Sequence, residues 1–474
     1  MDPASSGAEN SSAAAPQPPI GVGRAEGLWP VDGGLFALAF ALRLVLFLAM
    51  LARHPDGFFQ IDSSGYWQLA GNLLEGHGFS ASEEAPRVPE HSRTPGYPVF
   101  LAVFRKLGLP PAGVVFAQLL LSSLAAPLTS RLARRLGASA AGGRLAGGLV
   151  ALDVPSISLA NALVSETLFA VLLLGMALVL AGGPGPGFFR AALAGFALGL
   201  AILVRPIAAL LPAVIWICLA IGRARRARLI ALGFFFLGCA LPLTPWLARN
   251  ARVFGRPFLS TIGHHNLLYY RAAGTLAWAE QISLVEAQGR LGRRAAETIP
   301  FTPAEDPVSF KRREGALGLR LLAERPALSA WIQATSSLSL LVRPLRSTLD
   351  LQLGWAPQGT TLSRWGDPAR ARRWRRLLES TSPTTLALVG FQLAVAPAVV
   401  TLFLIGVIRQ ARRGSKVGVA LVVILVAYFA LISGGAEAYA RFRAPIVPFL
   451  AIGAAWGLEA VGDRWKRLSR TPSC

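Results

Sequence analysis

The stretch from residue 59 to residue 80, FQIDSSGYWQLAGNLLEGHGFS, combines an early carboxylate with an amphipathic helix pattern. Asp62 opens the pattern, Tyr66 and Trp67 follow within two turns, and Gly76 ends it. Aromatic residues of this kind favour a helix that lies flat at a membrane boundary. A cap and a functional role are compatible for Asp62, because a carboxylate that caps the backbone amides at a helix start stays ionised and is held rigidly.

A second acid, Glu166, lies in the apolar stretch ANALVSETLFAVLLLG. An ionised group costs roughly 2.5 kcal/mol or more at the centre of a bilayer and less near its edge, so Glu166 must face a polar cavity or a partner. The alternative is a helix-start acid that is stabilised by the helix dipole. Asp153, in ALDVPS, indicates no more than a local turn before Pro155.

Several arginines occur in short segments beside apolar runs, where orientation in the membrane does not require them. A guanidinium matches the oxygens of a phosphate group, so phosphate binding is one explanation. Snorkelling to the interface, or pairing with Asp62 or Glu166, is the other. The arginines concerned are Arg205, Arg249, Arg441 and Arg443. Rigid turns next to proline favour Arg205 and Arg249 as the main phosphate ligands.

Other polar residues predict less. Arg43, in the middle of the first apolar run, indicates structural pairing. His77, His91 and the pair at 264–265 could ligate a metal, but their spacing matches no HExxH-type motif. The sequence therefore does not decide whether a divalent metal takes part.

The elements that carry these residues are those of a membrane protein. The chain has 474 residues, 53% hydrophobic and 15% charged, with a mean hydropathy of +0.50, whereas soluble proteins carry about 25% charged residues. The formal charge is +22, and the basic residues gather between apolar runs. This distribution is typical of membrane orientation and of anionic lipid as a partner, and it argues against nucleic acid.

Ten apolar runs approach the ~20 residues that a membrane helix needs. They lie at 34–52, 97–130 (broken at Pro110-Pro111), 142–160, 163–181, 190–204, 206–222, 228–247, 385–408, 417–433 and 443–460. With ten crossings and the N-terminus inside, the basic clusters at 131–144, 223–228, 409–416 and 464–470 all fall on the cytoplasmic side. We therefore predict an all-α polytopic protein of the inner (plasma) membrane with both termini in the cytoplasm.

The same topology divides the chain into five parts. It predicts a disordered tail at 1–28, a first bundle at 29–248 that includes an outer loop at 53–96, and a long outer loop at 249–384. Two C-terminal parts follow, the membrane helices at 385–463 and a basic tail at 464–474. The long loop shows helical periodicity and is expected to form interfacial helices on the outer face.

The order of several motifs resembles polytopic glycosyltransferases of the GT-C type, in the branch of the protein mannosyltransferases and the bacterial aminoarabinose transferase (family 39-like). The first loop joins the helix pattern above to RTPGYPVFLAVF, and the other motifs follow in family order from about 34 to 460. They are NALVSETLF, GFALGLAILVRP, PWLARNARVFGRP and YARFRAPIVPFL.

The resemblance implies a helical bundle that transfers a hexosyl or pentosyl group from a polyprenyl-phosphate donor to an acceptor hydroxyl on a lipid, glycan or protein. It places the catalytic acid on Asp62 and the second acid on Glu166, with Tyr66 and the four arginines binding substrate. Many relatives carry Asp-Glu where this chain has Asp62-Ser63. A role of that acidic pair in binding a metal therefore does not carry over to this chain through its second member. The alternatives are a transporter or flippase of lipid-linked sugars and a non-catalytic scaffold, although the uniformly apolar spans disfavour transport.

Overall fold

The chain folds into helices. A computed structural model describes residues 30–469 apart from 83, 183–186, 221–224, 303–304, 346, 356–381, 415 and 437. Within these residues there is no β-sheet, only one antiparallel bridge between Ser80 and Pro89. The all-α prediction is therefore confirmed. The predicted tail at 1–28 lies outside the described residues, as do residues 470–474 of the basic tail at 464–474.

The first half of the chain forms the helices that carry most of the expected site. Their bounds are α1 Pro30–Arg53, α2 Ser63–Leu74, α3 Gly96–Lys106, α4 Pro111–Ser123, α5 Ala125–Arg135, α6 Ala140–Ala151, α7 Val154–Ala160, α8 Glu166–Leu180, α9 Gly187–Val204, α10 Leu211–Ala220 and α11 Arg225–Phe254. Short 3₁₀ turns, η1 Pro55–Phe58 and η2 Pro206–Ala208, lie between them.

The second half contains a set of helices between α11 and α19 and then three helices that end the bundle. The first set is α12 Ile262–Asn266, the π-helical turn η3 Leu267–Ala272, α13 Ala273–Glu280, α14 Leu284–Thr298, α15 Pro307–Glu324, α16 Pro326–Val342 and α17 Ser347–Gln352. The second set is α19 Pro383–Arg412, α20 Lys416–Ile432 and α21 Val447–Leu468, which follows the 3₁₀ turn η4 Ala440–Ile446.

Six helical segments of the described chain are long and apolar enough to cross a membrane, by length and composition. They are 32–53, 111–135, 187–204, 225–254, 383–412 and 440–467, and the shorter apolar helices α8 and α20 accompany them. Each of the ten predicted runs contains a helix, but ten crossings are not confirmed. The run at 142–160 is split into α6 and α7, and α10 has ten described residues. The break at Pro110-Pro111 is confirmed, because α3 ends before it and α4 begins at Pro111.

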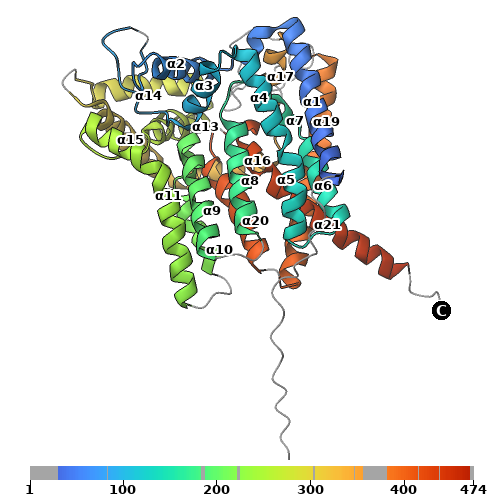
Figure 1. Cartoon of the computed structure of the whole chain (residues 1–474). Helices are drawn as coiled ribbons and strands as arrows, with labels where there is room; N and C mark the ends of the chain where they lie inside the picture. Colours follow the sequence, from blue (N-terminus) through green and yellow to red (C-terminus); the bar gives the residue numbers. More distant parts are fainter. Residues whose placement is uncertain are drawn as a thin grey trace, which may run out of the picture.

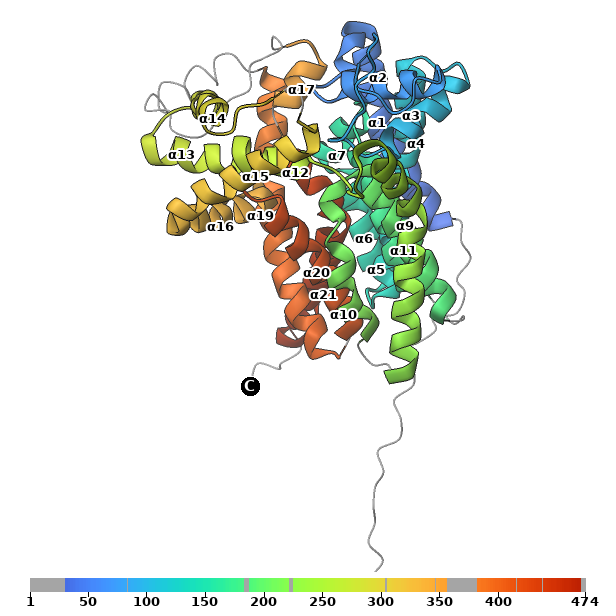
Figure 2. The same ribbon diagram turned by 90° about the vertical axis from the view of Figure 1, so that its left-hand side faces the viewer.

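The long helices stand roughly side by side, and the short helices gather at one end of them (Figure 1). Turned by 90°, α13, α15 and α16 extend sideways from the bundle at the same end (Figure 2). The predicted boundary at 248/249 falls inside α11, which continues to Phe254 before the short helices begin.

Helices α9 and α11 approach each other closely because glycines lie at their contact. A Cβ on Gly195 would come within 2.0 Å of the carbonyl oxygen of Phe235, and one on Gly238 within 2.0 Å of that of Ala192. Small residues let helix backbones come this close in a membrane bundle. The contact fixes α9, whose last residue Val204 directly precedes Arg205.

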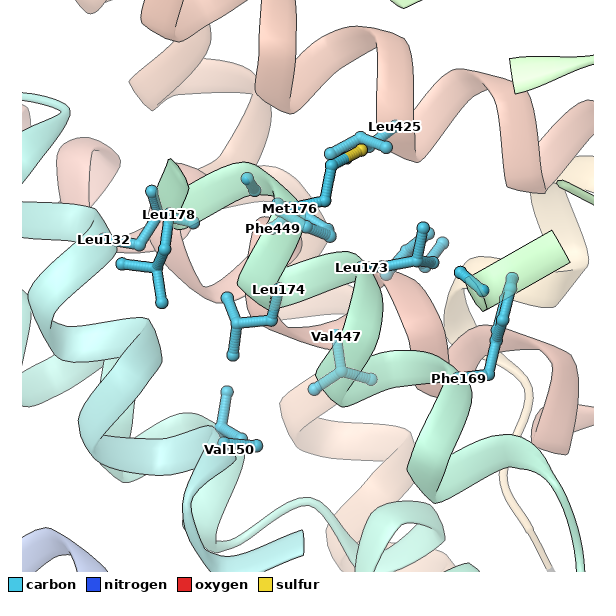
Figure 3. Close-up of a cluster of buried hydrophobic side chains, with 14 of the residues drawn as sticks. Leu132, Val150, Phe169, Leu173, Leu174, Met176, Leu178, Leu425, Val447 and Phe449 are labelled. Atoms are coloured by element: carbon cyan, nitrogen blue, oxygen red, sulfur yellow. The ribbon is translucent and has the colours of Figure 1, made fainter. Parts of the chain in front are cut away.

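Helix α8 lies in the middle of the bundle and is apolar on all sides, which is typical of a fully buried helix. Its side chains pack against α5, α6, α20 and α21, as Figure 3 shows for Phe169, Leu173, Leu174, Met176 and Leu178. Because α8 begins at Glu166, this core holds the second predicted acid on a rigid support.

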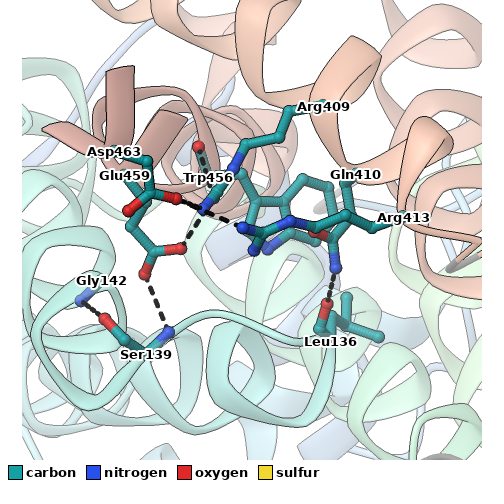
Figure 4. Close-up of polar contacts among 9 residues, drawn as sticks. All are labelled: Leu136, Ser139, Gly142, Arg409, Gln410, Arg413, Trp456, Glu459 and Asp463. Atoms are coloured by element: carbon teal, nitrogen blue, oxygen red, sulfur yellow. Dashed lines mark hydrogen bonds and ion pairs between the residues drawn. The ribbon is translucent and has the colours of Figure 1, made fainter. Parts of the chain in front are cut away.

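The opposite end of the bundle is tied together by charged and amide side chains (Figure 4). Arg409 of α19 contacts both Glu459 and Asp463 of α21. Glu459 also accepts a hydrogen bond from the backbone N–H of Ser139, at 2.8 Å, and Gln410 donates to the carbonyl of Leu136. Two of the basic clusters that the topology assigned to one side, at 131–144 and 409–416, thus meet at one end, together with the part of α21 that precedes the cluster at 464–470.

Candidate functional site

The first carboxylate of the site, Asp62, pairs with an arginine from near the other end of the chain. Arg441 donates from Nη2 to Asp62 Oδ2 at 2.9 Å. Asp62 precedes α2 at the N-cap position, yet its side chain makes no capping hydrogen bond. About a third of the carboxylate side chain, 34%, is exposed. The Asp62 side chain therefore binds Arg441 and does not cap α2.

The second carboxylate, Glu166, lies beside the same arginine and is almost fully buried, with 2% exposure. Its Oε1 is 2.8 Å from Arg205 Nη1 and 3.7 Å from Arg441 Nε. The 2.8 Å contact is an ion pair without the alignment of a hydrogen bond, since Oε1 has no hydrogen-bond donor among the described residues. Arg205 Nη1 donates to Ser165 Oγ at 3.1 Å. Arg441 thus links the two acids.

Aromatic rings surround this charged cluster. The guanidiniums of Arg205 and Arg441 lie 5.6 Å and 5.0 Å from the ring centre of Phe442. Tyr66 meets Tyr97 edge to face, with ring centres 5.0 Å apart. The Tyr97 hydroxyl donates to Gln118 Oε1 at 2.8 Å, which anchors α3 on α4. The rings reduce water access and hold the charged groups in place.

Arg93 is a third cation of the site, and our sequence reasoning did not single it out. Its guanidinium lies 5.4 Å from the ring centre of Tyr66. It packs on Gly65, where a Cβ would come within 2.9 Å of Arg93 Cζ. Its charge acts on Asp62, and it forms no ion pair within the described part of the chain. The available signal was its place at the start of the RTPGYP motif.

The charges of the cluster do not balance. Three guanidiniums, from Arg93, Arg205 and Arg441, surround two carboxylates. Fully ionised, the group carries one excess positive charge, which favours an anion.

The arginine charges lower the pKa of Asp62. Burial favours the neutral acid, but the charge and hydrogen bond of Arg441, with Arg205 and Arg93, outweigh it and hold the pKa of Asp62 below its usual value. For Tyr66, burial raises the pKa of the hydroxyl, against the opposing effect of Arg205. Asp62 is therefore a carboxylate and Tyr66 a neutral phenol at neutral pH.

Backbone packing places Arg205 beside α3. A Cβ on Gly96 would come within 2.6–2.7 Å of backbone atoms of Leu203 and Val204. Only glycine lets the start of α3 touch the end of α9 here, directly before Arg205. Since α2 packs on α3, this contact also locates Tyr66.

The other two expected arginines have their donors engaged elsewhere. Arg249 donates to the carbonyls of Glu90 and Phe79, and its guanidinium contacts the rings of Phe79, Trp246 and Phe254. Arg443 is 4% exposed and donates to the carbonyls of Leu341 and Arg343. Both fasten backbone segments, so neither is among the phosphate ligands proposed below.

The remaining polar candidates have local roles. Asp153 caps α7 by accepting from the backbone N–H of Ser156 at 2.9 Å. The ring of His265 packs on Tyr269, with ring centres 4.7 Å apart. In the described part of the chain no three His, Cys, Asp or Glu side chains gather in a way that could hold a metal ion.

Comparison with known proteins gives structural matches alone. No protein-family model matches the chain, and no curated protein does so. The archaeal oligosaccharyltransferase AglB from Archaeoglobus fulgidus, solved with an inhibitory peptide and a dolichol-phosphate, matches with a TM-score of 0.50 and 11% identity over 94% of this chain and 52% of that chain. The apo form of the A. fulgidus oligosaccharyltransferase matches with a TM-score of 0.50 and 13% identity, over 92% and 52%.

ArnT from Cupriavidus metallidurans, solved with undecaprenyl phosphate, matches with a TM-score of 0.37 and 16% identity, over 93% of this chain and 81% of that chain. The chain spans about half the length of the oligosaccharyltransferases. Those two matches show the fold, and the predicted resemblance to GT-C type membrane glycosyltransferases is confirmed at that level. The protein is a multi-pass, all-helical membrane protein.

Proposed function

We propose that this protein is a membrane glycosyltransferase that moves a sugar from a polyprenyl-phosphate donor to an acceptor hydroxyl. The observation that carries the proposal is the cluster of Asp62, Glu166, Arg93, Arg205 and Arg441. It combines an ionised, partly exposed carboxylate with an excess of guanidinium charge, at the end of a bundle with the GT-C fold. The matching AglB structure was solved with a dolichol-phosphate, which agrees with a lipid phosphate as ligand.

The reaction needs a base and a cationic cradle. A sugar on a lipid phosphate already has a leaving group, so the proton to be moved is that of the acceptor hydroxyl. Asp62 accepts this proton as the acceptor oxygen attacks the anomeric carbon. The bond from that carbon to the phosphate oxygen breaks, and its electron pair leaves with the lipid phosphate. A single displacement inverts the configuration at the anomeric carbon.

The arginines stabilise the departing phosphate. Arg93 has donors that face no carboxylate in the described structure, and Arg205 and Arg441 lie next to it around Tyr66 and Phe442. Preorganised cations of this kind stabilise developing charge without reorganising in the reaction. Glu166 fixes the two cations that it pairs with, and the hydroxyl of Tyr66 is suited to hydrogen-bond the substrate.

Arg441 has a second effect on the base. It donates to Asp62 Oδ2, which lowers the basicity of the carboxylate. A phosphate that competes for Arg441 weakens this pair, so donor binding makes Asp62 more basic. The base is then activated when the donor is in place.

We place this reaction on the outer face of the inner (plasma) membrane, with both termini in the cytoplasm. The basic clusters at the end shown in Figure 4 support the assignment, because positive residues favour the cytoplasmic side. The sugar is a hexose or pentose, and the acceptor is a lipid, a glycan or a protein.

The test is transfer by the purified protein in liposomes that contain a polyprenyl-phosphate donor with a radiolabelled sugar, supplied with lipid, glycan and peptide acceptors. Label in a new product with inverted linkage supports the proposal. Label that crosses the bilayer on intact donor, without transfer, would instead support the flippase. Asp62→Asn serves as the catalytic control, because Asn preserves the size of the side chain and removes the base.

A further inference from the structure

A small cavity lies behind the carboxylate cluster, inside the bundle. Its volume is about 30 Å³, and α1, α4, α7 and α8 contribute its polar lining, Arg43, Ser122, Ser156, Glu166 and Thr167. One water molecule needs roughly 10–15 Å³ of such space and two to four polar partners. The cavity is therefore large enough for one or two waters and has the polar groups to hold them.

Arg43 supplies an unused donor to this cavity. Its side chain is fully buried, and it donates from Nε to Ser122 Oγ at 2.8 Å and from Nη1 to the carbonyls of Ala39 and Ala151. Its Nη2 is buried with no hydrogen-bond partner among the described residues. An unpaired donor on a buried cation is costly, so a partner that can enter the cavity is strongly favoured.

Glu166 supplies a carboxylate to the same cavity. It lines the space, and its buried Oε1 has ion-pair partners but no aligned donor within the described residues. A water can accept from a guanidinium and donate to a carboxylate at the same time. The two unsatisfied groups are thus complementary through water.

We propose that this cavity is an ordered-water site that joins Arg43 to Glu166, with water accepting from Arg43 Nη2 and donating to the Glu166 carboxylate. Arg43 is then a positioning residue. It acts through water on the carboxylate that orients Arg205 and Arg441, and it stabilises the charge of Glu166 from inside the bundle.

The role in turnover rests on the proposed function, whereas the water site itself does not. The first measurement is therefore a structure of the wild-type protein at a resolution that shows waters. We expect density in the cavity within hydrogen-bond distance of Arg43 Nη2. Ala170→Leu fills the cavity from α8 without changing any charged group, and should remove that density. An empty cavity in the wild type would overturn the proposal, whether or not the protein transfers sugar.

Infrared spectroscopy tests the coupling without any substrate. The carboxylate band that disappears in Glu166→Gln identifies Glu166. That band should move in Arg43→Gln and in Ala170→Leu, and should return toward its wild-type position in Arg43→Lys, which keeps a buried cationic donor. Bands that stay unchanged in both Arg43→Gln and Ala170→Leu would refute the coupling. Arg43→Lys and Ala170→Leu keep the measurement decisive if Arg43→Gln fails to fold.

In the transfer assay, Ala170→Leu should lower kcat by about tenfold or more with little change in donor KM, because the reacting groups shift while the lipid site stays intact. Ser122→Ala, which removes a partner of Arg43 and leaves the cavity open, should have a smaller effect. Normal kcat in Ala170→Leu, with the density absent, would overturn the positioning role. If the wild type shows no transfer, the density and the infrared band still decide the water site.

Discussion

Asp62→Asn separates the chemical role of this residue from its structural role. The Asp62 side chain makes no capping hydrogen bond, and its partner Arg441 keeps a contact with Glu166 at 3.7 Å. The Asp62–Arg441 pair is about one-third exposed, at 34% and 29%. Such pairs contribute roughly 0–1 kcal/mol, so the variant should lose about 1 kcal/mol of stability at most.

The loss in turnover should be much larger. A positioned general base contributes roughly 10²–10⁴-fold, which is about 2.7–5.4 kcal/mol of activation free energy at 1.36 kcal/mol per decade. We expect kcat to fall by that factor in the liposome assay, while the melting temperature in detergent changes little. Donor binding should persist, because the arginines remain.

Asp153→Ala is the matched control. Asp153 is also an acid at a helix start, but it accepts from the backbone and the hydroxyl of Ser156, at 2.9 and 2.7 Å. Its loss should cost about 0.5–2 kcal/mol of stability and leave kcat intact. The reasoning fails if Asp62→Asn turns over at the wild-type rate, or if both variants lose stability and turnover together.

Other variants test the cations, the pH dependence and the packing. Arg205→Lys keeps the charge but loses the planar guanidinium with its paired donors, and should weaken donor binding. Arg249→Lys should lower stability and leave donor affinity unchanged. Equal donor affinity in the two variants would contradict these different roles. Because the pKa of Asp62 is lowered from 3.8, the stability from its ion pair is present above pH 3.8 and is lost as pH falls through the folded-state pKa. A loss of stability that is centred above pH 3.8 in the wild type and is absent in Asp62→Asn would contradict the lowered pKa. Gly238→Ala should cost about 1–3 kcal/mol, because its Cβ would lie 2.0 Å from a carbonyl oxygen of α9, while Gly233→Ala on the same helix meets nothing within 4 Å and should be neutral or stabilising in a thermal unfolding assay.

The helical fold was predictable from the sequence because apolar runs and basic clusters report directly on burial and on membrane sides. Glu166 was predictable for a related reason, since a charge in apolar surroundings requires a partner, whereas Asp62 was singled out by its place at the start of an amphipathic stretch and by the family resemblance. Arg441 was named among four arginines, but its contact with Asp62 spans 379 positions. No local pattern encodes a pair of that separation.

Two features explain where the sequence was less informative. Arg249 and Arg205 both lie near proline, yet only the folded chain shows that Arg249 donates to carbonyls of the first loop. Arg93 escaped notice because its role depends on Gly65 and Tyr66, which support its guanidinium. The number of membrane crossings could not be predicted from composition, because α8 and α20 are apolar but shorter than the helices that are long enough to span a membrane.

The separation of Asp62 and Arg441 along the chain has a consequence for biosynthesis. At roughly 5–20 residues per second, a ribosome needs about 20–75 s to make the 379 residues between them. Glu166 is made during that time, and from then on the chain holds both acids, whereas the cation that joins them has not been made. A nascent chain that stalls before η4 therefore carries two carboxylates without their shared arginine. The completed pair marks a chain that has been synthesised at least as far as η4, and products truncated before η4 should be catalytically silent.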